Sequence, residues 1–220
     1  MSSYKVDYQD LPAQVYETLK EMILTGELRS GDKLVQDELA QLLGVSRTPL
    51  LAALSKLENE MLVRSVPRRG FFVRALSRQE FVHIYDLRLR LEPLGAAEAA
   101  TSASEDEVEE LSRFVAQFDE VAESGEEGEI KESDYRLHMQ IMAMSRNWLL
   151  YNIISSFNII LIANLEGLLK DARRSAAQHN MILRAIAARD SRRAEEAMHF
   201  HIEESRERLL ERVVEQHAPN

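Results

Sequence analysis

Three histidines and an aspartate fall at positions where helical periodicity turns their side chains toward a protein interior. Asp134 and His138 are four residues apart, so they share one face of a predicted helix and can chelate one ion together. His179 lies on a stripe of apolar residues spaced three and four apart. His201 lies on another such stripe, whereas His199 aligns with glutamates and is expected to face solvent.

Three imidazole nitrogens and one carboxylate oxygen form a donor set for a divalent metal ion. Zinc is expected first, and nickel, manganese or iron also accept such ligands. The chain has no cysteine, so thiolate ligands are excluded. A single histidine of this kind is more often a hydrogen-bonded core residue, but four converging polar groups need partners, which a metal supplies. The set predicts a metal centre, with a polar core cluster as the alternative.

An arginine on a predicted inward face adds a positive charge to the same domain. Arg88 follows Phe81, Ile84 and Tyr85 on one stripe of its helix. A buried cation needs an anionic partner, and a carboxylate effector can supply one. The alternative is an ion pair with Glu92, four residues later, and the sequence leaves both open.

The elements that must position these residues are helices. Capping boxes at residues 77–80 and 104–107 each begin a long segment with apolar residues three and four apart. No strand pattern follows them. Further helices are expected near residues 131–145, 147–170, 172–188 and 190–216. The fold class is therefore mainly α, with an antiparallel bundle of about six helices in a domain of residues 76–220.

The first 75 residues have a different pattern. Apolar residues at helical spacing predict three helices, and the tight turn at residues 43–46 between the second and third is typical of a helix-turn-helix. Residues 62–66 and 71–74 then predict two strands around Pro67-Arg68-Arg69-Gly70. Residues 1–75 are therefore expected to form a winged helix-turn-helix with a β-hairpin wing.

This arrangement predicts contact with double-stranded DNA. The third helix presents Arg47 and Thr48 near its N-terminus, where base edges in the major groove can be read. Arg68 and Arg69 in the wing can reach phosphates or the minor groove. The net charge of −10 argues against DNA binding by the whole chain, but residues 1–75 hold ten basic and ten acidic residues, so the negative excess lies in residues 76–220.

No segment has the pattern of secretion or membrane insertion. The N-terminus lacks the apolar core of a secretory signal, and the apolar segment 148–169 is interrupted by asparagines and serines. The absence of cysteine fits a reducing compartment. A cytoplasmic protein with no membrane partner is expected.

Four segments resemble one family of bacterial regulators. The stretch GELRSGDKLVQDELAQLLGVSRTPLLAALSKLENEMLVRSVPRRGFFV is similar to the N-terminal signature of the GntR family. The blocks YDLRLRLEPLGAAEAA, DYRLHMQIMAMSRN and QHNMILRAIAARDSRRAEEAMHFHI resemble the FCD ligand-binding domain of the FadR-type branch, which would cover residues 78–214. One departure is Leu51, which stands where the family usually has an arginine that contacts DNA.

The resemblance implies roles for particular residues. Arg47, Thr48, Arg69 and Gly70 occupy DNA-contact positions of the family. The family's metal ligands carry over to Asp134, His138, His179 and His201, with a carboxylate-bearing metabolite completing the coordination of the ion. Asn147 matches a Ser-x-Asn turn and is expected to orient that effector, with a helix cap as the alternative.

These observations predict a homodimeric transcription regulator, a repressor whose operator affinity is modulated by a small carboxylic acid at a metal centre. One alternative is a metal-dependent hydrolase, in which Glu166 is the best general base. Another is a metal sensor without an organic ligand, in which the ion itself is the signal.

Overall fold

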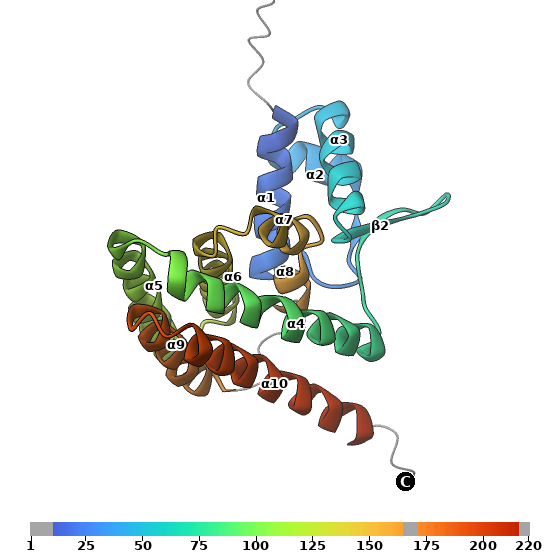
Figure 1. Ribbon diagram of the computed structural model, residues 1–220. Helices are drawn as coiled ribbons and strands as arrows, with labels where there is room; N and C mark the ends of the chain where they lie inside the picture. Colours follow the sequence, from blue (N-terminus) through green and yellow to red (C-terminus); the bar gives the residue numbers. More distant parts are fainter. Residues whose placement is uncertain (1–10, 165–170, 216–220) are drawn as a thin grey trace, which may run out of the picture. The chain divides into compact units, whose positions relative to one another are not determined.

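The computed structural model describes residues 11–164 and 171–215 and divides the chain into two units, Met1–Ala75 and Leu76–Asn220 (Figure 1). The fold is mainly α-helical, as predicted, and its one sheet in the described residues is small and lies in the first unit.

Three helices form the frame of the N-terminal unit: α1 (Leu11–Thr25), α2 (Gln36–Leu43) and α3 (Arg47–Asn59). Helix α2 ends at Gly44, which takes the left-handed conformation with φ of 66° that a residue without Cβ adopts at low cost. Two residues, Val45 and Ser46, then lead into α3 at Arg47. The predicted helix-turn-helix is confirmed, and apolar residues of α3 pack its inner face: Leu50, Leu54 and Leu57.

The wing is part of a three-stranded antiparallel sheet. Strands β2 (Val63–Val66) and β3 (Gly70–Val73) form the predicted hairpin, with Val66 opposite Gly70 at its tip. A third strand, β1 (Lys33–Leu34), pairs with the other edge of β3. The sequence analysis missed β1 because two residues are too few to show an alternating pattern.

The C-terminal unit contains seven helices within the described residues, one more than predicted. They are α4 (Arg78–Ser102), α5 (Glu105–Ser124), α6 (Glu127–Met144), α7 (Trp148–Ser156), α8 (Ile159–Asn164), α9 (Ala172–Ala187) and α10 (Ser191–Glu215). Both predicted capping boxes form, at Ser77 with Glu80 and at Ser104 with Glu107. Each serine accepts from the backbone of its glutamate, whose carboxylate accepts from the backbone of the serine.

Two predicted helix boundaries were wrong. The expected helix 147–170 is interrupted after Ser156, because Phe157 ends α7 and Asn158 has a positive φ of 47°. Helix α6 begins at Glu127, four residues before the predicted start, and acidic residues in its first turn interact favourably with the helix dipole. Glu166, the proposed base of the hydrolase alternative, lies outside the described residues.

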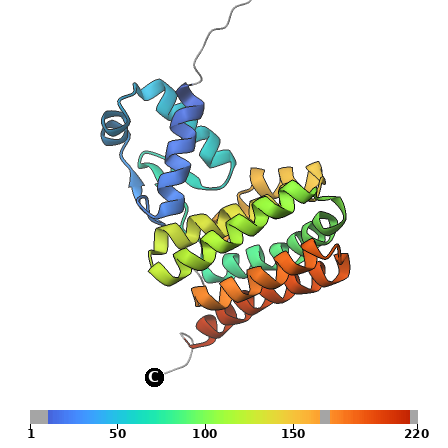
Figure 2. The ribbon, with the colours of Figure 1, turned by 90° about the vertical axis from the view of Figure 1, so that its left-hand side faces the viewer.

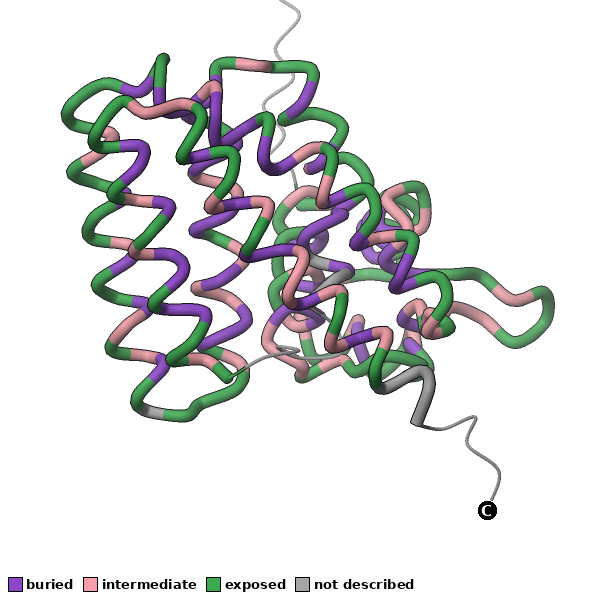
Figure 3. Tube along the Cα trace, turned by 60° about the horizontal axis from the view of Figure 1, so that its bottom comes forward, coloured by how far each residue is buried: buried purple, intermediate pink, exposed green. Residues whose placement is uncertain are grey.

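Helix α10 packs along α4 and against α9, and α5 packs against both α6 and α9 (Figures 1 and 2). Buried residues recur about once per turn along these helices, as the purple segments of the tube show (Figure 3). Most of the core is apolar, but twelve of the polar or charged residues that the structure describes are also buried, and all twelve lie in the C-terminal unit. Four of them form the site described next.

Candidate functional site

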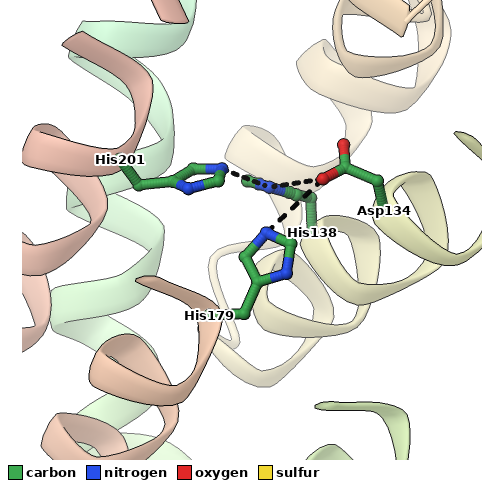
Figure 4. A group of neighbouring side chains, drawn as sticks. All are labelled: Asp134, His138, His179 and His201. Carbon is green, nitrogen blue, oxygen red and sulfur yellow. Dashed lines mark hydrogen bonds and ion pairs between the residues drawn. The ribbon is translucent and has the colours of Figure 1, made fainter. Parts of the chain in front are cut away.

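Three helices bring four buried donors together. Asp134 and His138 come from α6, His179 from α9 and His201 from α10 (Figure 4). None of the four exposes more than 3% of its surface. One donor atom of each residue lies within 4.8 Å of the chosen atom of every other. The structure therefore joins all four residues that helical periodicity selected.

The spacing of these atoms fits the coordination shell of one small ion. The Nε2 atoms of His138 and His201 are 3.1 Å apart. Oδ1 of Asp134 lies 3.4 Å from Nε2 of His179 and 3.8 Å from Nε2 of His138. Ligand atoms of a tetrahedral zinc ion, with bonds of about 2.0 Å, lie about 3.3 Å apart. The donor set and its spacing are thus compatible with a divalent metal ion.

A buried carboxylate holds the outer nitrogen of His138. Oε2 of Glu92, on α4, lies 2.5 Å from Nδ1 of His138, and the Glu92 side chain is fully buried. Arg88, one turn earlier, donates from Nε to Oε1 of Glu92 at 2.5 Å. Arg88 therefore has an internal partner, so the ion pair is the alternative that the structure shows. Its guanidinium also lies 5.1 Å from the ring centre of Tyr85.

The electrostatics keep both carboxylates of this region ionised. Burial raises the pKa of Asp134, but the neighbouring His138, His179 and Arg88 outweigh it and hold that pKa well below its usual range. Burial likewise opposes ionisation of Glu92, and Arg88 and His138 together lower its pKa. Burial raises the pKa of the Tyr85 hydroxyl to about 12, so Tyr85 stays protonated.

The predicted DNA-binding residues lie on the surface of the N-terminal unit. Arg47 and Thr48 are exposed in the first turn of α3, and Arg47 donates from Nε to Oδ1 of Asp37 at 2.7 Å. Leu51 is also exposed, one turn further along the same helix.

At the wing tip, Arg68 and Arg69 are exposed, and Arg68 has a positive φ of 63°. The guanidinium of Arg69 lies 5.6 Å from the ring centre of Phe72. This cation–π contact directs the Arg69 side chain along the wing. Gly70, half-buried, has a φ of 93° that favours glycine.

Both units match known families. Residues 11–73 match the family described as bacterial regulatory proteins, gntR family, and residues 83–204 match the FCD domain. This chain belongs to the GntR family and carries an FCD domain. Its N-terminal unit is of the DNA-binding type found in GntR transcription regulators, and the known proteins that it resembles are transcription regulators.

Individual GntR regulators resemble the whole chain or large parts of it. The HTH-type transcriptional regulator YdhC of Bacillus subtilis is 30% identical over 66% of this chain, and the chain spans only 65% of YdhC. The HTH-type transcriptional repressor GlaR of Escherichia coli is 27% identical over 85% of this chain and 90% of GlaR. The solved structure of E. coli McbR has the same fold, with a TM-score of 0.81, 21% identity and coverage of 97% of this chain and all of that one.

Asn147 forms hydrogen bonds with Leu150 and Glu98 rather than with the four donors of the FCD unit. Its Oδ1 accepts from the backbone N of Leu150 at 3.1 Å, which makes Asn147 the N-cap of α7. Its Nδ2 donates to both carboxylate oxygens of Glu98, at 3.0 and 3.3 Å. An effector role for Asn147 stays a prediction.

Sequence reasoning missed two residues that support the histidines. Glu92 was considered only as a partner of Arg88, because nothing in the sequence shows that α4 packs beside His138. Gln178, whose Oε1 lies 3.1 Å from Nδ1 of His201, was not singled out at all. The available signal is general: the second ring nitrogen of a metal-binding histidine almost always donates to an oxygen acceptor.

Among the residues that the structure describes, no helix combines the length and the apolar character that crossing a membrane requires.

Proposed function

We propose that this GntR regulator binds operator DNA as a homodimer in the cytoplasm and represses transcription until a small carboxylic acid binds at a metal centre in its FCD unit. The observation that carries the proposal is the convergence of four buried donors, Asp134, His138, His179 and His201, from three helices. A divalent ion is a partner that all four of these buried polar groups can share.

These residues would hold one divalent ion, zinc in the first instance, with nickel, manganese and iron as ions of suitable chemistry. Such an ion supplies a Lewis-acidic position that an oxygen ligand can fill. Asp134 is the only anion among the four donors, so the centre would keep a net positive charge in a buried place. The carboxylate of Glu92 does not change this balance, because Arg88 compensates it. An anionic effector is therefore favoured over a neutral one.

Arg88 is the residue expected to orient the acid. Its charge is close enough to Asp134 to help lower the pKa of that carboxyl. The ion pair with Glu92 uses Nε and Nη2, and a guanidinium has five N–H donors, so Arg88 can donate to an effector while it stays paired. In this proposal Asn147 binds the effector only if the effector replaces Glu98 as the acceptor of the hydrogen bond from Nδ2.

Operator binding would use Arg47, Thr48 and the wing residues Arg68, Arg69 and Gly70. Two copies related by a two-fold axis place their recognition helices about 34 Å apart on a near-palindromic site. An effector that binds one arrangement of the two N-terminal units better than the other shifts operator affinity by linkage, typically by about 5–150-fold. The repressor name of the relative GlaR supports the direction proposed here.

A second candidate is a regulator in which the metal ion itself is the signal. It is favoured by the origin of the donors on three helices, because the ion alone would tie α6, α9 and α10 together.

One experiment separates these functions. An operator is first selected from random double-stranded DNA with the full-length protein. Its affinity is then measured by fluorescence anisotropy with zinc alone, with a panel of di- and tricarboxylic acids alone, and with both. The proposal predicts weaker DNA binding only with zinc and one of the acids together. An equal response to zinc alone supports the metal sensor, and unchanged affinity throughout contradicts both.

A further inference from the structure

The outer nitrogen of His201 contacts an amide whose orientation is fixed by its neighbours. Oε1 of Gln178, a residue 4% exposed on α9, lies 3.1 Å from Nδ1 of His201. Nε2 of the same amide donates to Oε2 of Glu204 at 2.6 Å. The Glu204 carboxylate can only accept, so the amide NH₂ must face Glu204 and the amide oxygen must face His201. Nδ1 of His201 therefore carries the hydrogen.

Glu204 is itself held by two arginines. Arg174, on α9, pairs with its Oε1, and Nη2 of Arg208, one turn further along α10, lies 3.3 Å from the same atom. The side chain of Glu204 is 11% exposed, whereas Arg174 and Arg208 are 54% and 42% exposed. A continuous chain of polar contacts thus runs from the surface through Glu204 and Gln178 to His201.

The same logic applies to His138, with a different acceptor. The Glu92 carboxylate, paired with Arg88, accepts from Nδ1 of His138, so this ring also carries its hydrogen on Nδ1. In the neutral form that binds metals, His138 and His201 then direct the lone pairs of their Nε2 atoms at each other across 3.1 Å. Two facing lone pairs repel, and a cation between them removes the repulsion.

We propose that Gln178, oriented by Glu204, is a positioning residue that keeps His201 in the tautomer whose Nε2 lone pair faces the cluster, and that it thereby sets the affinity of the site for a divalent ion. This inference rests on the proposed metal site. Helix α9 then has two roles. It supplies the ligand His179, and through Gln178, the residue before His179, it orients His201 on α10.

The test uses the full-length protein, its zinc affinity from competition with a chromophoric chelator, and the His201 tautomer from long-range ¹H–¹⁵N NMR of the metal-free protein. Gln178→Ala is expected to weaken zinc binding about 10–100-fold, the range found when the outer partner of a metal ligand is removed. It should also populate the Nε2–H tautomer of His201, which the parent lacks.

Asn180→Ala is the matched control. Asn180 lies two residues further along α9 and donates from Nδ2 to the Asp119 carboxylate on α5, at 3.1 and 3.2 Å. This substitution removes an amide–carboxylate bond between helices, as Gln178→Ala does, without touching a histidine. It should leave zinc affinity and the His201 tautomer as in the parent.

A second variant answers the objection that Gln178→Ala only loosens the bundle. Gln178→Glu/Glu204→Gln reverses the pair, so a carboxylate accepts from His201 and an amide donates to that carboxylate. It should restore zinc affinity to that of the parent or better. Equal zinc affinity in Gln178→Ala and Asn180→Ala, or a double variant as weak as Gln178→Ala, overturns the inference.

Failure of the metal proposal is recognised separately. If neither the parent nor the Asn180→Ala control binds zinc, the metal site is refuted, and so is the effect of Gln178 on zinc affinity. The tautomer is still read in the metal-free protein, and Nε2–H at His201 in the parent overturns the role of Gln178 on its own.

Discussion

Removing the carboxylate of Glu92 should destabilise the FCD unit strongly even without metal. Glu92 is fully buried and Arg88 is 2% exposed, and their ion pair spans 2.5 Å between Nε and Oε1. Glu92→Ala leaves the Arg88 charge buried without its partner, which typically costs about 3–5 kcal/mol. For a chain of this size that loss corresponds to a decrease in melting temperature of roughly 6–20 °C.

The measurement is thermal and urea-induced unfolding followed by far-ultraviolet circular dichroism, in chelator, so that metal affinity does not contribute. Glu109→Ala is the control, because Glu109 pairs with Arg113 at the same spacing of four residues but with side chains 69% and 70% exposed. Exposed pairs of this kind contribute little, so the control should unfold as the parent does. If the two variants lost the same stability, the buried pair would not stabilise the bundle as argued.

Three further predictions concern the N-terminal unit. Arg69→Ala should weaken binding to all DNA sequences and reduce the slope of log affinity against log salt by about 1, since one phosphate contact is lost. An unchanged slope would show that Arg69 does not contact the DNA. Leu51→Arg should shift the sequence selected from random DNA toward guanine within each half-site, because arginine pairs with guanine by two hydrogen bonds, and an unchanged selection would place position 51 away from the bases. Leu54→Ala, at a fully buried position of α3, should cost about 2–5 kcal/mol in the stability of this unit by hydrogen exchange, whereas Leu42→Ala, at a residue 68% exposed, should cost far less.

Helical periodicity was sufficient to find the four donors. It selected His201 over His199, and the structure buries the first while the second is 44% exposed and paired with Glu203. The choice is reliable because a helix that buries one face fixes which of two residues, two positions apart, can point inward. The capping boxes at Ser77 and Ser104 could also be predicted, because each involves residues only three positions apart in the sequence.

The features that were missed depend on packing between helices or on the backbone at single residues. Glu92 reaches His138 from another helix, 46 residues earlier in the chain, and Gln178 reaches His201 across the α9–α10 contact. Neither contact produces a periodic pattern in the sequence. The end of α7 depends on the left-handed conformation of Asn158. A polar residue within an apolar segment does not by itself predict that conformation.

The metal content of the purified protein tests the central claim most directly. The full-length protein is prepared without added metal or chelator and analysed by elemental mass spectrometry, together with His201→Ala and His199→Ala. We expect about one equivalent of zinc or another divalent ion in the parent and in His199→Ala, and little or none in His201→Ala. A metal-free parent that takes up no zinc on addition, or a His201→Ala variant that holds as much metal as the parent, would contradict the account.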